Sequence, residues 1–170
     1  MKKQGVAYWK KKLWTVFSEY TRVRDALRTT GGIEKLRCCS CGKLYPAFGI
    51  GCAQAGHFIP GRHNAVLFDP MGVHGQCYNC NVTLKGNWVG YLDFMHKNYG
   101  RPATDDLIAK SKLVVHFTPD ELVEWLNLYK ALVKNMRTFK QLPETQTYEA
   151  VRLEFHPVPG DKGVGVTTLF

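Results

Sequence analysis

Two Cys-x-x-Cys pairs separated by 35 residues constrain this chain more than any other feature of its sequence. The first pair is Cys38 and Cys41, and the second is Cys77 and Cys80. The two-residue spacer lets both sulfurs of a pair turn toward one ion, and four thiolates complete the tetrahedral set of a structural Zn²⁺ site. The spacing therefore predicts one closed zinc site that links two distant segments of the chain.

The two remaining cysteines leave some freedom in this assignment. Cys39 offers a second register for the first pair, but Cys38 reproduces the spacing of the second pair. Cys52 has no partner, and we expect it to be a buried apolar residue. A simple zinc ribbon has a gap of about 15–20 residues between its pairs, so the longer gap here predicts an inserted element.

The net charge of +9 is concentrated at the start of the chain. Residues 1–43 hold 11 basic and 3 acidic side chains. A basic surface attracts polyphosphates, so we expect Lys10, Lys11 and Lys12 to contact nucleic acid, although a solvated helix face would look the same. No apolar run approaches the roughly 18 residues of a membrane span, and the N-terminus lacks the apolar segment of a signal peptide. We expect a cytoplasmic protein with no membrane partner.

Hydrophobic periodicity predicts helices on both sides of the cysteine-containing region. An amphipathic helix is expected over 6–29, with its basic side chains mostly outside the apolar face. Short strands are expected near 53–59 and 72–76. Helical structure is expected from about Cys77–Cys80 and again from Asn87, with a break at Gly100 and a short helix after Thr104.

The later part of the chain carries a clear helix start. Thr118, Pro119 and Glu121 form a capping box with proline at the first helical position, which predicts a helix to about residue 140. Alternating apolar residues in the tail predict a β-hairpin. We divide the chain into a basic N-terminal helix (1–32), a zinc-stabilised core (33–98), a C-terminal helical segment (99–142) and a tail (143–170).

Between and just after the cysteine pairs lie the polar residues that suggest chemistry. A histidine on a short strand, a polar loop and a helix opened by Cys-x-x-Cys-Asn would bring His57 and Asn81 to one cleft. The candidates in this region are His57, Arg62, His63, Asp69, His74, Asn81 and Lys85.

The sequence resembles the NinG (Rap) recombination proteins of lambdoid phages in an ordered set of motifs: C-x2-C, A-G-H-F, H-x-Q-C-x2-C-N and K-G-N. Those proteins in turn resemble the wider HNH, or ββα-metal, nuclease class. The resemblance covers residues 36–95 well and does not extend to the tail. The matching residues are Cys38, Cys41, Ala55, Gly56, His57, Phe58, His74, Gln76, Cys77, Cys80, Asn81, Gly86 and Asn87.

This resemblance implies roles for individual residues. It makes His57 the general base that activates water, and an imidazole suits that task because its pKa of about 6.5 lies near working pH. It makes Asn81 a ligand of a catalytic Mg²⁺ or Mn²⁺ ion, with His74 and then Asp69 as further candidates. The alternatives are a histidine that only packs in the zinc module, an asparagine that caps a helix, and a His74 that supports the strand.

Phosphate contacts are expected from Arg62, His63 and Lys85, although a solvated loop would also carry such residues. Two positions depart from the HNH pattern. Gly56 occupies the position where many members have an acidic metal ligand, and Gly72 occupies the position of the middle Asn of the pattern. Relatives that share this glycine can carry Asp where this chain has Gln54. These departures leave the ligand set of the catalytic ion open.

We therefore expect an α+β protein, with a treble-clef-like zinc module that carries a ββα-metal (HNH-like) core flanked by helices. The resemblance implies a metal-dependent DNA endonuclease acting on branched recombination intermediates such as Holliday junctions or D-loops, in the cytoplasm of a bacterial host. A homodimer would supply the two cuts that junction resolution needs. The alternatives are a non-catalytic zinc-dependent nucleic-acid-binding module and a phage assembly protein that kept the scaffold.

Overall fold

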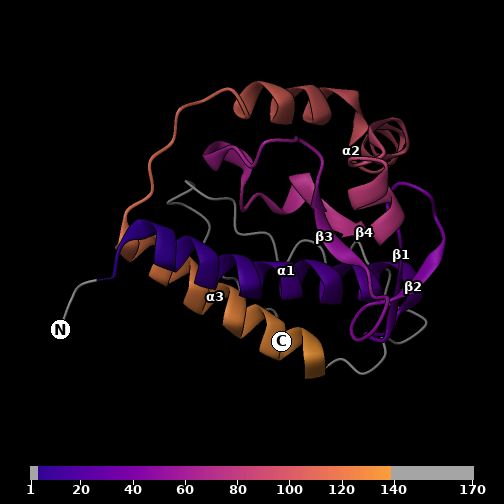
Figure 1. Ribbon diagram of the computed structural model, residues 1–170, viewed down its shortest axis with the longest axis horizontal. Helices are drawn as coiled ribbons and strands as arrows, with labels where there is room; N and C mark the ends of the chain where they lie inside the picture. Colours follow the sequence, from indigo (N-terminus) through magenta and orange to yellow (C-terminus); the bar gives the residue numbers. More distant parts are fainter. Residues whose placement is uncertain (1–3, 139–170) are drawn as a thin grey trace, which may run out of the picture.

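The computed structural model describes residues 4–138, and three helices enclose two small antiparallel sheets (Figure 1). This mixture confirms the α+β class. The elements are α1 (Val6–Thr30), β1 (Lys35–Arg37), β2 (Leu44–Pro46), β3 (Gln54–His57), β4 (Val73–Gln76), α2 (Trp88–Lys110) and α3 (Pro119–Thr138), with short 3-10 turns at Asn64–Val66 and Pro70–Gly72 and a π-helical turn at Asn79–Thr83.

The long helix α1 is the element against which the rest of the chain packs, and it confirms the helix predicted over 6–29. It ends where Gly31 adopts φ 73° and its N–H bonds to the Leu27 carbonyl, a conformation that glycine reaches without steric cost. The predicted basic face is only partly exposed, because the Arg24 side chain is 4% exposed and turns into the protein. The buried apolar residues of α1 are Leu13, Phe17, Tyr20, Val23, Ala26 and Leu27.

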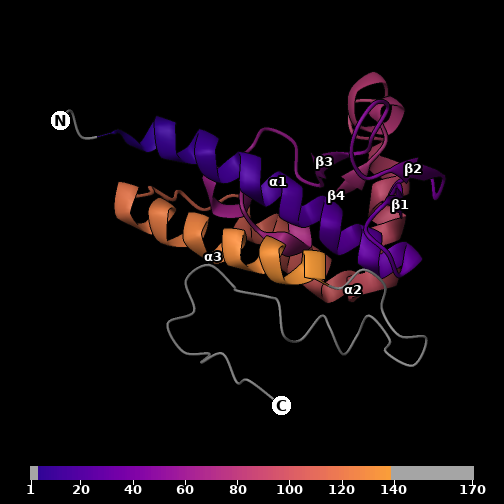
Figure 2. The same cartoon turned by 90° about the horizontal axis from the view of Figure 1, so that it is seen from below.

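Helix α3 lies alongside α1 and runs in the same direction (Figure 2). Its predicted capping box is confirmed, because Glu121 Oε2 accepts from the Thr118 N–H at 2.8 Å and the Glu121 N–H donates to Thr118 Oγ1 at 3.3 Å. The Phe17 and Tyr129 rings meet edge to face at 4.9 Å between the two helices. The main core therefore joins the first and last described elements.

The strands form two separate hairpins. β3 and β4 confirm the strands predicted near 53–59 and 72–76, and they pair in the register Gln54↔Gln76 to His57↔Val73. β1 and β2 were not expected, because three-residue strands are too short to show alternation. One hairpin presents the first cysteine pair and the other presents His57.

Helix α2 contains the predicted break at Gly100, which has φ 80° and ψ 162°. The helix resumes immediately rather than after Thr104, because Pro102 suits the first turn of the new segment. The expected hairpin at 143–170 lies outside the described residues. Within residues 4–138, no helix has the length and apolar character needed to cross a membrane.

Candidate functional site

The cysteines of the two pairs form one cluster, in which the four sulfurs of Cys38, Cys41, Cys77 and Cys80 lie within 4.8 Å of one another. The Cys41 and Cys77 sulfurs are 3.9 Å apart. A tetrahedral ion with Zn–S bonds of about 2.3 Å would place its sulfurs about 3.8 Å apart. In the described part of the chain, no other group of three His, Cys, Asp or Glu side chains gathers in this way. Cys39 lies outside the cluster, which confirms the register of the first pair.

Backbone and side-chain amides support this cluster. The Cys80 N–H approaches Cys77 Sγ at 3.4 Å, and Asn87 Nδ2 donates to Cys80 Sγ at 3.3 Å. Gly42 adopts φ 70° and donates its N–H to the Cys38 carbonyl at 2.8 Å, which closes the first turn. Such donors stabilise thiolates, so the donor set fits a structural zinc ion. That ion would tie the β1–β2 hairpin to the turn carrying Asn81.

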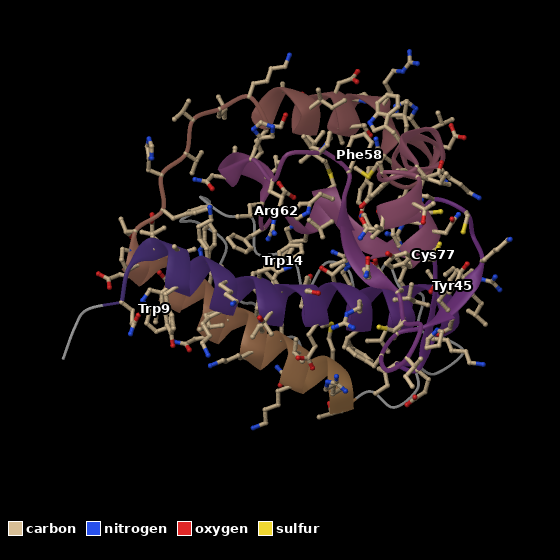
Figure 3. The ribbon with its side chains drawn as sticks, viewed as in Figure 1. Trp9, Trp14, Tyr45, Phe58, Arg62 and Cys77 are labelled. Carbon is tan, nitrogen blue, oxygen red and sulfur yellow. The ribbon has the colours of Figure 1, made fainter. Side chains whose placement is uncertain are left out.

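A cleft of about 440 Å³ lies between α1 and the start of β3. It brings His57, Asn81 and Arg62 together, and Figure 3 shows Arg62 beside Trp14 of α1. Its complete lining is Trp14, Ser18, Arg22, Cys52, Ala53, Gln54, Ala55, His57, Arg62 and Asn81. Two guanidinium groups and no carboxylate line this cleft, so the described residues make its charge positive.

His57 is held in a defined orientation. Its ring stacks on Trp14 at 4.8 Å with an interplanar angle of 14°, and Nε2 lies 3.1 Å from the Leu67 carbonyl oxygen. A carbonyl only accepts, so Nε2 carries the proton and Nδ1 keeps its lone pair. Burial lowers the pKa of His57 and the nearby Arg62 charge adds to this effect, while the bond to Leu67 opposes it. The imidazole is therefore neutral near pH 7 and able to accept a proton.

Asn81 lies on the turn after the second cysteine pair, and its Nδ2 donates to Gln54 Oε1 at 2.8 Å. A Cβ on residue 56 would lie less than 3.0 Å from both Gln76 Oε1 and Asn81 Oδ1. Gln76 is fixed there, because its Nε2 donates to Ser40 Oγ at 2.6 Å and to a backbone carbonyl at 2.7 Å. An acidic side chain at position 56 would have to displace Gln76, which explains the first departure from the HNH pattern.

At the second departure, a side chain on residue 72 would require a small shift of Leu107. A Cβ on Gly72 would meet Leu107 Cδ2 at 3.3 Å, so helix α2 occupies the space beside this backbone. Oxygen ligands suit Mg²⁺ and Mn²⁺, and the cleft offers the amide oxygens of Asn81 and Gln54. Mg²⁺ is usually bound through one or two carboxylates together with substrate phosphates, and the described residues that line the cleft include no carboxylate, so a bound phosphate would have to supply the anionic oxygens of such a site.

His74 lies outside the cleft and is completely buried. Its Nε2 lies 3.1 Å from the Met71 carbonyl, which can only accept, and Arg24 Nη2 donates to its Nδ1 at 2.9 Å. Asp25 Oδ2 also lies 3.2 Å from Nδ1 and favours the protonated ring, but burial dominates and lowers the pKa of His74 to about 4, so the imidazole is neutral near pH 7. Arg24 also pairs with Asp25, whose carboxylate accepts the Gly75 N–H at 2.6 Å. His74 thus joins α1 to β4 in this structure and is not brought to Asn81.

This network should make the protein sensitive to acid. An unfolded histidine titrates near 6.5, so between that pH and about 4 the unfolded chain binds a proton that folded His74 does not. The contribution of neutral His74 to the free energy of unfolding is complete above pH 6.5 and should fall as the pH drops toward 4. Thermal unfolding measured from pH 7.5 to 4 tests this, and His74→Gln should flatten the dependence while lowering stability at neutral pH. Equal slopes for both proteins would contradict it.

The other candidates lie outside the cleft. Asp69 caps a 3-10 turn by accepting the Met71 N–H and pairs with Lys110 Nζ at 2.7 Å, so its carboxylate serves the fold outside the cleft. Lys10 donates to Asn64 Oδ1 at 2.8 Å. The exposed candidates, which do not line the cleft, are Lys11, Lys12, His63 and Lys85.

Sequence reasoning did not identify the α1 wall of the cleft. This wall consists of Trp14, Ser18 and Arg22, which follow one another at intervals of four residues and so share one face of α1. That spacing is the sequence pattern from which the wall could have been predicted. Cys52 corrects another expectation, because it is half-buried on the cleft wall with its sulfur 3.8 Å from Arg22 Nη1.

Comparison with known proteins identifies one family. No curated protein and no solved structure matches this chain. The family model described as Bacteriophage Lambda NinG protein matches residues 1–139, which is most of the chain and includes the cysteine cluster and the cleft. With the geometry of both sites in place, that match shows that the chain belongs to the NinG family.

Proposed function

We propose that this protein is a zinc-stabilised, metal-dependent DNA endonuclease of phage recombination, built on an HNH-like core. The observation that carries the proposal is His57, a neutral imidazole in a positively charged cleft, whose Nδ1 lone pair makes no hydrogen bond to the described residues. A β3–β4 hairpin that precedes a turn bearing Asn81 also suits a ββα-metal site. The preference for branched DNA rests on the family resemblance.

In the proposed reaction, His57 Nδ1 takes a proton from water and the hydroxide oxygen attacks the phosphorus atom. A new P–O bond forms, the bond to the leaving oxygen breaks, and solvent protonates that oxygen. Asn81 orients the site through its bond to Gln54. A Mg²⁺ or Mn²⁺ ion held by Asn81, Gln54 and DNA phosphates would supply stabilisation of negative charge on the phosphate oxygens.

A non-catalytic nucleic-acid-binding module is the second candidate. No carboxylate of residues 4–138 lines the cleft, and this favours the binding module, because hydrolytic nucleases often bind their ions through carboxylates. A labelled four-way junction and a linear duplex of the same sequence, each incubated with Mg²⁺ or Mn²⁺, separate the two. Cutting of the junction supports the endonuclease, whereas binding without cutting under every ion supports the module.

The pH dependence of cutting provides a further prediction. Only neutral imidazole accepts a proton, so the rate should rise with pH and level off as His57 deprotonates. Because burial lowers the pKa of His57, the midpoint of this rise should lie below 6.5. Single-turnover rates from pH 5 to 8 at saturating metal measure it. A midpoint well above 6.5 would assign the base to another group.

A further inference from the structure

We propose that Arg22 and Arg62 together bind one DNA phosphate in the cleft, and that this phosphate binds before any divalent ion. The inference rests on the proposed function, which it deepens by naming the groups that hold the substrate. It assigns a role to Arg22, which neither the family resemblance nor the cysteine motifs identify.

Arg22 presents a fixed guanidinium to the cleft from α1. Its Nε donates to the Ser18 carbonyl and its Nη1 to the Ala47 carbonyl, both at 3.2 Å. The guanidinium also lies 4.6 Å from the centre of the Phe48 ring. These contacts hold the plane of the group, while Nη2 makes no hydrogen bond to the described residues. A preorganised guanidinium loses little conformational entropy when it binds an anion.

Arg62 contributes the second guanidinium from the loop that follows β3. It lies 4.7 Å from the centre of the Trp14 ring, and the same ring stacks on His57. The backbone of Arg62 has φ 52°, a left-handed conformation that is uncommon for arginine and fixes the direction in which its side chain leaves the loop. Stacking thus holds a positive charge close to the proposed base.

The charge balance of the cleft determines the order of binding. Two guanidinium groups with no carboxylate among the lining residues attract an anion and repel a divalent cation. A bound phosphate reverses this balance and supplies the anionic oxygens that the amides of Asn81 and Gln54 lack. A guanidinium group can donate two parallel N–H bonds to two oxygens of one anion, and a phosphodiester is the anion that the proposed function supplies.

The experiment measures affinity for a fluorescently labelled four-way junction in buffer free of Mg²⁺ and Mn²⁺, without chelators that would remove zinc. Wild type should bind under these conditions. Arg22→Met and Arg62→Met should each weaken binding by about 10- to 100-fold, as expected for the loss of a charge-assisted contact. Because both groups contact one phosphate, the double variant Arg22→Met/Arg62→Met should reduce the log–log salt slope by about 0.9, and each single variant by less. Arg22→Lys and Arg62→Lys should keep the slope and recover only part of the affinity.

Arg101→Met provides the matched control, because Arg101 is exposed on α2 and does not line the cleft. It should change affinity less than twofold. Wild-type affinity and salt slope in both cleft variants would overturn the proposal, as would binding that requires Mn²⁺. Arg62 is exposed, so its variant tests the proposal even if Arg22→Met unfolds. Arginine-dependent binding by a wild type that never cuts would support this phosphate site and contradict only the nuclease.

Discussion

Cys77→Ser should yield protein that is unfolded or insoluble. The side chain is one of four that converge within 4.8 Å, and a structural zinc site contributes about 10–16 kcal/mol of apparent binding free energy. That amount is comparable with the whole stability of a domain, roughly 5–15 kcal/mol. Circular dichroism, solubility and metal content by mass spectrometry measure the effect, and Cys41→Ser should behave in the same way.

Cys52→Ser is the matched control, because Cys52 lies on the cleft wall outside the sulfur cluster. It should fold with about one zinc per chain. A folded Cys77→Ser protein, or folded wild type that contains no zinc, would show that the cluster does not stabilise this fold through a metal.

His57→Ala should lower the rate of junction cutting by about 10²- to 10⁴-fold, the usual range for the loss of a general base. Junction binding should persist, because phosphate contacts supply most of the affinity. His116→Ala is the matched control, since His116 is exposed, does not line the cleft and has no role assigned to it. Its cutting rate should stay within a few-fold of wild type. If His57→Ala cuts at the wild-type rate, His57 is not the general base.

Asn81→Ala should act differently from His57→Ala in the same assay. Removing the amide oxygen should raise the Mg²⁺ or Mn²⁺ concentration needed for the half-maximal rate, with a smaller loss at saturating ion. An unchanged metal dependence in this variant would assign the ion to other oxygens.

Local signals in the sequence predicted the long helices and the strands β3 and β4, but not β1 and β2, and tertiary contacts determined most of the cleft. The apolar spacing in α1, the capping box at Thr118 and the cysteine spacing act over a few residues, so each could be interpreted without the fold. The burial of Arg24 and the approach of Arg62 to Trp14 depend on segments about 50 residues apart. Tertiary contacts are also needed to distinguish His57, which lines the cleft, from His74, which is buried between α1 and β4, because only the structure reveals the partners of each ring.

The parallel arrangement of α1 and α3 has a consequence for synthesis. The apolar face of α1 leaves the ribosome well before α3, the helix that covers it, because about 90 residues separate the end of α1 from the start of α3. Contacts that are distant in sequence form late because the intervening chain must first be closed into a loop. Until α3 emerges, the nascent chain lacks the helix that covers Phe17 and Tyr20, and apolar surface of this kind is the surface that chaperones protect during synthesis.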